Sequence, residues 1–173
     1  MNDLLNEENT NLEVITTSDN YGKPATFINN LTKQKVEDET TILELLSFGE
    51  NIRKTASTHF NISSSRSHTI FQINLELHEM QSNGQSLVKT SEINLVDLAG
   101  SESLSSGNTD RQRECKNINK SLLALSNVIL DLSKQKSNSK FISYRTSKLT
   151  RILQKSLSGN SKTLIICTIN QAK

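Results

Sequence analysis

The spacing of hydrophobic residues predicts a chain in which strands and helices alternate. From Phe71 to Leu77 apolar side chains occupy every second position, which is the period of a strand with one buried face. In the range 42–52 they recur at helical spacing, after three acidic residues that complement the dipole of a helix's first turn. The same helical spacing returns over residues 118–132 and 149–157. This alternation favours an α/β fold built on a layered sheet.

Turn residues predict the boundaries in the first half of the chain. Gly22, Lys23 and Pro24 predict a turn, followed by a strand or hairpin arm over Thr26–Val36. The range 55–67, rich in Ser, Thr and Asn, is typical of a polar loop. Ser82, Asn83 and Gly84 predict a second turn, and the next strand is expected from about Thr90 to Asp97.

Cap residues predict the boundaries near the C-terminus. Thr146 or Ser147 can cap the helix of 149–157, and Gly159 is placed to end it. The nearly unbroken apolar run Thr163–Ile169 is typical of a strand that is buried on both faces.

The composition is that of one domain with a modest apolar content. The chain has 173 residues, of which 34% are hydrophobic and 4% aromatic, and this length suffices for a core. Its two cysteines are far apart and its three histidines form no zinc pattern, so we expect a reducing compartment and no structural metal. No apolar run approaches the length of a membrane span, so we expect a cytoplasmic protein without a membrane partner.

The net charge of +2 conceals a gradient along the chain. The first fifty residues hold ten acids and three bases, whereas Leu132–Lys173 holds nine Lys and Arg and no acid. Such an asymmetry predicts that the C-terminal part meets an acidic surface, and the alternative is a solvated basic helix face.

The stretch from Asp97 to Glu102 contains the first candidate chemistry. Asp97 closes the apolar strand of residues 93–96, and Gly100 follows three positions later. A carboxylate at a strand end can orient a metal-bound water, and a glycine lets a backbone N–H approach a terminal phosphate. The alternative is an ordinary turn, because Asp also ends strands by forming turns.

A second cluster, Asn61–His68, precedes the strand that begins near Phe71. Its serines can ligate Mg²⁺ or position a water, and Arg66 can hold a phosphate or a carboxylate. A serine-rich surface loop is the plainer interpretation. Because the two clusters lie at the ends of adjacent strands, together they predict a two-sided nucleotide sensor.

Five motifs in order make the chain resemble the kinesin motor domain. They are N-x-x-S-S-R-S-H, D-L-A-G-S-E, N-I-N-K-S-L-x-A-L, Y-R-x-S-K-L-T-R-I-L-Q and S-L-x-G-N-x-K-T, and they cover roughly Thr55–Ala172. Within the family, Phe141–Thr168 resembles the centromere-associated kinesins or related plus-end motors. The resemblance implies a P-loop NTPase-type layered sheet with helices on both faces, and ATP with Mg²⁺ as cofactor. It also implies the microtubule as partner, a cytoskeletal location and no nucleic acid.

The resemblance also implies roles for individual residues. Asn61–His68 corresponds to switch I, where Asn61 and Ser64 meet the nucleotide and its attacking water, and Ser65 faces Mg²⁺. Asp97–Glu102 corresponds to switch II: Asp97 holds Mg²⁺ through water and the Gly100 N–H senses the γ-phosphate. Arg66 and Glu102 pair across the closed switches, and the helix of 118–133 corresponds to the relay helix. The microtubule-facing residues would be Phe141, Arg145, Lys148 and Arg151.

One departure from the kinesin pattern limits these expectations. The 173 residues contain no P-loop motif G-x-x-x-x-G-K-[ST], and Gly159–Thr163 is no substitute because Ser161 precedes Lys162. We therefore expect a partial motor domain over 1–173, missing the P-loop strand and the final helix, and inactive as an ATPase on its own. The alternatives are a nucleotide-independent microtubule-binding module and a GTPase-like switch, which the absent guanine-reading N-K-x-D motif argues against.

Overall fold

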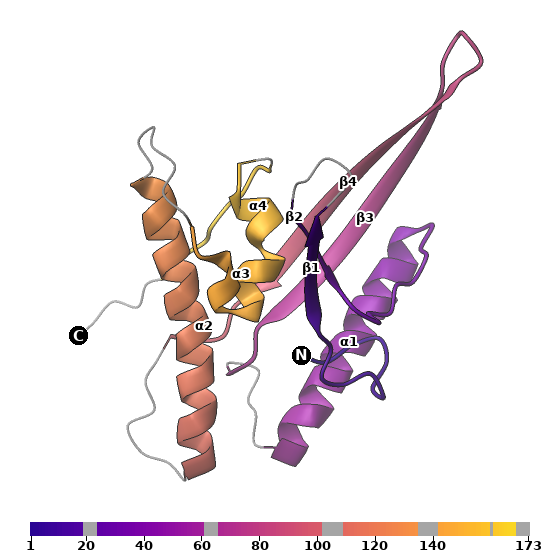
Figure 1. Ribbon diagram of the computed structural model, residues 1–173. Coiled ribbons are helices and arrows are strands. Elements are labelled where there is room, and N and C mark those ends of the chain that lie inside the picture. The colour runs from indigo at the N-terminus through magenta and orange to yellow at the C-terminus, as the bar shows by residue number, and fades with distance from the viewer. Residues whose placement is uncertain (19–23, 61–65, 102–108, 135–141, 160, 169–173) are drawn as a thin grey trace. The chain divides into compact units, whose positions relative to one another are not determined.

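The structure is a computed structural model that describes residues 1–18, 24–60, 66–101, 109–134, 142–159 and 161–168 (Figure 1). Side chains are not described at residues 24, 56–60 and 109–118. The chain divides into two compact units. The first consists of Met1–Ile52 and Leu104–Lys173, and the second of Arg53–Ser103. Each unit is described by itself below.

A β-hairpin lies near the start of the first unit. Its strands β1 (Val14–Ser18) and β2 (Pro24–Ile28) pair antiparallel, with Val14 opposite Ile28. A hairpin arm was expected over Thr26–Val36, but the strand ends at Ile28. Asn30 follows with a φ of 57°, and this left-handed backbone cannot continue a strand.

Helix α1 (Glu39–Phe60) begins at the acidic residues expected there, with Glu39 in its first turn. The Asp38 carboxylate accepts hydrogen bonds of 2.8 Å from the N–H and from the hydroxyl of Thr41, and these bonds hold the pKa of Asp38 below its ordinary value. Gly49 is buried on the predicted apolar face, and the atoms of Leu4 lie close to it.

The expectation of a polar loop beginning at residue 55 is wrong, because α1 continues to Phe60. Residues 55–60 contain neither Gly nor Pro. Ser and Thr disfavour a helix interior by only a few tenths of a kcal/mol, so polar composition alone does not end a helix.

The remaining helices of the first unit surround its core. They are α2 (Thr109–Ser133), the 3₁₀ helix η2 (Tyr144–Thr146), α3 (Lys148–Ile152) and α4 (Gln154–Leu157). α2 packs against η2 and α3, and α3 packs against β1 and β2. The buried apolar side chains are Leu12, Val14, Ala124, Leu125, Val128, Tyr144, Leu149 and Leu153.

The sequence offers Thr146 and Ser147 as candidate caps for the helix α3, and the structure distinguishes them. Ser147 is the cap: its Oγ accepts from the Thr150 N–H at 3.1 Å, and its own N–H donates to the Thr150 Oγ1 at 3.2 Å. Thr146 belongs to η2. The single helix expected over 149–157 is divided at Leu153 into α3 and α4, and Gly159 follows with a φ of 97°, the left-handed conformation that favours glycine.

The second unit contains a long antiparallel hairpin of β3 (Thr69–Met80) and β4 (Ser86–Asp97). Phe71 lies opposite Leu95 and Ile73 opposite Ile93, so the predicted apolar alternation forms one face of the hairpin. The predicted turn is present, with Gly84 at a φ of 78°.

A strand was expected over Thr163–Ile169, and its described part is not a strand. Residues 163–168 carry no regular structure, and Leu164 and Ile166 are 84% and 82% exposed. A strand needs a neighbour for its backbone N–H and C=O groups, and the described strands pair only as β1–β2 and β3–β4. The described residues therefore form two antiparallel pairs and no single layered sheet.

Candidate functional site

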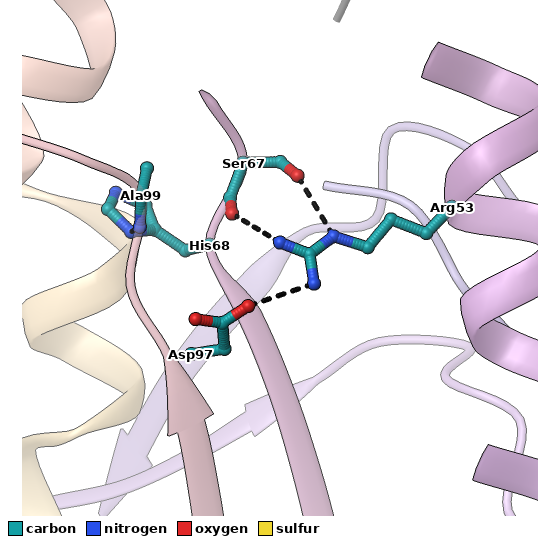
Figure 2. Close-up of polar contacts among 5 residues, drawn as sticks. All are labelled: Arg53, Ser67, His68, Asp97 and Ala99. Carbon is teal, nitrogen blue, oxygen red and sulfur yellow. Dashed lines mark hydrogen bonds and ion pairs between the residues drawn. The ribbon is translucent and has the colours of Figure 1, made fainter. Parts of the chain in front are cut away.

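The two predicted clusters meet at one end of the β3–β4 hairpin. Asp97 is the last residue of β4 and lies directly opposite Thr69, the first residue of β3. Because the strands are antiparallel, the residues just before β3 and just after β4 share this end. Ser67 and His68 therefore lie beside Asp97 and Ala99 (Figure 2).

Arg53 joins these segments. Its guanidinium lies between Ser67 and Asp97 (Figure 2), with Nη2 3.1 Å from the Ser67 carbonyl oxygen and Nε 3.3 Å from the Ser67 Oγ. Its Nη1 forms an ion pair of 3.0 Å with Asp97 Oδ2. The Arg53 side chain is 10% exposed and that of Asp97 68%. Ser67 thus holds the largely buried guanidinium of Arg53 in place, while most of the Asp97 carboxylate is exposed to solvent.

His68 fixes the backbone that follows β4. The Ala99 N–H donates to His68 Nδ1 at 3.0 Å, so this nitrogen carries no proton. Burial lowers the pKa of His68 below its ordinary value, and the carboxylate of Asp97 opposes that shift in part. A neutral imidazole is therefore the form that holds Ala99, one residue before Gly100.

The structure describes only some of the predicted nucleotide-site residues. Asp97 and Gly100 lie at the hairpin end, with Gly100 half-buried, and Arg66 is half-buried just before Ser67. Outside the described residues lie four others, namely Asn61, Ser64, Ser65 and Glu102. The expected pair of Arg66 with Glu102 therefore stays a prediction.

The predicted microtubule-facing residues belong to the first unit. Arg145 in η2 is exposed. Lys148 Nζ donates to the Leu12 carbonyl at 3.2 Å, and Arg151 Nη2 donates to the Val14 carbonyl at 2.6 Å. Phe141 lies outside the described residues.

The possible metal ligands among the described side chains suit an ion that a nucleotide holds for the most part. In the described ranges no three His, Cys, Asp or Glu side chains gather into a group that could enclose a metal ion. Mg²⁺ in nucleotide sites takes one or two carboxylates and completes its shell with phosphates and water. The exposed Asp97 carboxylate fits that role. Separately, none of the helices in the described ranges is both long and apolar enough to cross a membrane.

Two residues of this site carried no specific assignment from the sequence. Arg53 directly follows the helical pattern of residues 42–52, and it lies 44 positions before its partner Asp97. No local pattern indicates a contact over that separation. His68 was part of a quoted motif, but its bond to Ala99 required the strand register.

A hairpin that ends in Asp-x-x-Gly beside a Ser- and Arg-containing segment is typical of nucleotide-dependent switch proteins. The chain belongs to the kinesin motor domain family, whose model matches residues 1–173. Kinesin-related protein 13 of Dictyostelium discoideum is 50% identical over 136 residues, which is 78% of this chain and 10% of that protein. Kinesin-like protein KIN-7N of Arabidopsis thaliana is 43% identical over 171 residues, which is 98% of this chain and 20% of that protein.

Solved motor structures agree with this assignment. A fast kinesin superposes with a TM-score of 0.74 at 37% identity, covering 90% of this chain and 42% of that one. The motor domain of Kar3 from Saccharomyces cerevisiae gives a TM-score of 0.70 at 42% identity, covering 92% of this chain and 46% of that one. The expected α/β motor-type fold class is therefore confirmed. The finer resemblance to centromere-associated kinesins finds no support. The chain spans between a tenth and a fifth of the length of the two curated relatives above.

Proposed function

We propose that this chain supplies the phosphate-responsive and microtubule-facing parts of a kinesin motor, which couples ATP hydrolysis to movement on microtubules. The observation that carries the proposal is the Asp97–Gly100 segment at the end of β4. Arg53 holds its first residue through an ion pair, and His68 holds Ala99 through a hydrogen bond. A segment held at both points can pass a small displacement at a phosphate to the strands behind it.

Each site residue has a role in this proposal. Asp97 would hold Mg²⁺ through water, and the Gly100 N–H would donate to the terminal phosphate of ATP. Ser65 would face the metal, while Asn61 and Ser64 would meet the nucleotide and orient the attacking water. When bound, ATP with Mg²⁺ supplies the phosphoryl group and the cation that stabilises its transfer.

The pair of Arg66 with Glu102 completes the hydrolytic site in this proposal. It forms only when the switches close around the nucleotide. Removing one partner of such a shielded pair typically costs about 3–5 kcal/mol, so the closed state depends strongly on it.

The basic C-terminal segment faces the microtubule in this proposal, which places the protein on the cytoskeleton. Its charge supports the assignment, since Leu132–Lys173 contains nine cations and no acid. The residues concerned are Phe141, Arg145, Lys148 and Arg151. The whole of residues 1–173 then acts as part of one motor domain.

A segment exchange tests this function. A kinesin that glides microtubules has its matching segment replaced by residues 1–173, and gliding is measured in ATP. We expect the exchanged motor to glide microtubules and Asp97→Ala to abolish the gliding. The control is Lys35→Ala, which removes only an exposed ion pair with Glu37 and should leave the gliding speed unchanged. An exchanged motor that folds and binds microtubules but hydrolyses no ATP would refute the proposal.

The 173-residue chain alone is expected to release no phosphate in the presence of microtubules. Phosphate release that Asp97→Ala removes would show this expectation to be wrong. Sedimentation with microtubules that weakens with salt but ignores ATP would favour the alternative of a nucleotide-independent binding module.

A further inference from the structure

Two cations of the proposed microtubule-facing set donate to backbone carbonyls of β1 and of the segment just before it. Arg151 Nη2 donates to the Val14 carbonyl at 2.6 Å and to the Thr16 Oγ1 at 3.1 Å. Lys148 Nζ donates to the Leu12 carbonyl at 3.2 Å. Each bond joins α3 to a segment more than 130 residues earlier in the chain. These cations therefore make contacts within the first unit.

The surroundings of Arg151 agree with an internal role. Val14 and Leu149, on the two elements that it joins, are 6% exposed. The Arg151 side chain is half-buried, and its Nε is a buried nitrogen that reaches no acceptor among the described residues. Arg145, in contrast, is exposed and forms no hydrogen bond or ion pair with the described part of the chain.

The β1–β2 hairpin needs such support. A two-stranded hairpin is marginally stable in water by itself, and the described residues add no third strand to it. Its packing against α3 provides the apolar contacts, and the bonds from Arg151 set the position of β1 along α3. A charged donor forms the stronger class of hydrogen bond.

We propose that Arg151, assisted by Lys148, is a positioning residue that fastens β1 to α3 and so holds the hairpin in the arrangement that microtubule binding requires. Of Arg145, Lys148 and Arg151, it is Arg145 that meets the microtubule directly. The inference rests on the proposed function, because it concerns how the same surface is built.

Direct and indirect roles differ in their dependence on salt and on the neighbours of the cation. A cation at the rim of an interface contributes through its charge, so its removal lowers the association rate and flattens the salt dependence. A positioning residue contributes through its bonds to β1. Removing the Thr16 hydroxyl, which changes no charge, must then reproduce part of its effect.

The experiment measures two quantities in the 173-residue chain, hydrogen exchange of the β1 amides and affinity for microtubules over a salt series. The variants are Arg151→Ala, Thr16→Val and the double variant. Thr26→Val is the matched control, because it removes the 3.3 Å contact between the Thr16 and Thr26 hydroxyls and leaves Thr16 available to Arg151. Arg145→Ala represents a direct contact.

We expect Arg151→Ala to speed amide exchange in β1 by roughly ten- to a hundredfold. This factor corresponds to the free energy of one hydrogen bond from a charged donor. Thr16→Val should show a smaller increase that is not additive with Arg151→Ala. Both should weaken microtubule binding, and Thr16→Val should leave its salt dependence as in the unaltered chain. Arg145→Ala should weaken binding and flatten the salt dependence without changing exchange in β1. Thr26→Val should leave binding unchanged.

Two results would overturn the inference. If Arg151→Ala leaves β1 exchange unchanged and flattens the salt dependence as Arg145→Ala does, Arg151 is itself a direct contact. If β1 exchange rises in Arg151→Ala and Thr16→Val while affinity stays constant, Arg151 is a structural residue only. If the unaltered chain does not bind microtubules at low salt, the proposed function fails, and with it the role in binding, while the exchange data still show whether Arg151 anchors β1.

Discussion

Replacing Arg53 with alanine removes a cation that bonds the carbonyl and hydroxyl oxygens of Ser67 and the carboxylate of Asp97 at one end of the β3–β4 hairpin. The largest part of its effect comes from the bond to the Ser67 carbonyl, because a charged donor that is only 10% exposed contributes about 1.5–3 kcal/mol. The ion pair with Asp97 adds at most about 1 kcal/mol, since that carboxylate is 68% exposed and screened by solvent. With the longer bond to the Ser67 Oγ, Arg53→Ala should destabilise this end by about 3 kcal/mol.

Amide hydrogen exchange in the second unit measures this local effect. A loss of about 3 kcal/mol should speed exchange at Thr69–Phe71 and Leu95–Asp97 by roughly a hundredfold. The opposite end of the same hairpin, where Met80 pairs with Ser86, should exchange as before and serves as an internal control. Asp97→Asn keeps an oxygen acceptor for Arg53 and removes only the charge, so its effect should be less than about tenfold.

Two outcomes would refute this reasoning about Arg53. Unchanged exchange at Thr69–Phe71 in Arg53→Ala would mean that the guanidinium does not hold the hairpin end. An effect of Asp97→Asn as large as that of Arg53→Ala would mean that the exposed ion pair, and not the bond to Ser67, carries the stabilisation.

Two further predictions concern the first unit. Burial raises the pKa of Asp3, but the N–H groups of Thr32 and Leu5 at 2.7 and 2.9 Å outweigh burial and hold it below its ordinary value. Asp3 thus contributes stability above about pH 4 that is lost as the pH falls through its lowered pKa. Asp3→Asn should therefore cost about 1–3 kcal/mol at pH 7, and this cost should shrink steadily as the pH is lowered in acid unfolding. The Thr150 hydroxyl, in a residue that is fully buried, bonds the Tyr144 carbonyl at 2.7 Å. Thr150→Val should lower the thermal midpoint by about 2–8 °C because it removes this hydroxyl. Thr150→Ser keeps the hydroxyl and loses only a buried methyl group, so it should lower the midpoint less.

The elements that could be predicted from the sequence depend on neighbouring residues. The alternation from Phe71 to Leu77 predicts β3, and the three acidic residues before the helical pattern of 42–52 predict the start of α1. Ser147, one of two candidate caps, starts α3, and a cap acts over only three or four residues. Gly84 and Gly159 have positive φ angles where a turn and a helix end were predicted. Features that a window of a few residues determines were therefore recoverable.

Features that depend on distant partners were not recoverable. α1 continues past residue 55 because nothing in 55–60 stops it, and composition does not show this. Residues 163–168 have the apolar pattern of a buried strand, but a strand exists only where another strand pairs with it. Arg53 likewise becomes part of the site only once β3 and β4 bring Ser67 and Asp97 together.

The C-terminal cations show why the charge pattern of a segment does not tell which of its cations contact a partner. Nine cations without an acid indicate an acidic partner if all of them face outward. Arg145 and Lys148 are both exposed and Arg151 is half-buried. Arg151 and Lys148 donate to carbonyls of β1 and of the segment before it, and such backbone acceptors enter no charge count. A basic segment can therefore owe part of its charge to internal hydrogen bonds. Only the fold separates the cations that bind a partner from those that hold the surface in shape.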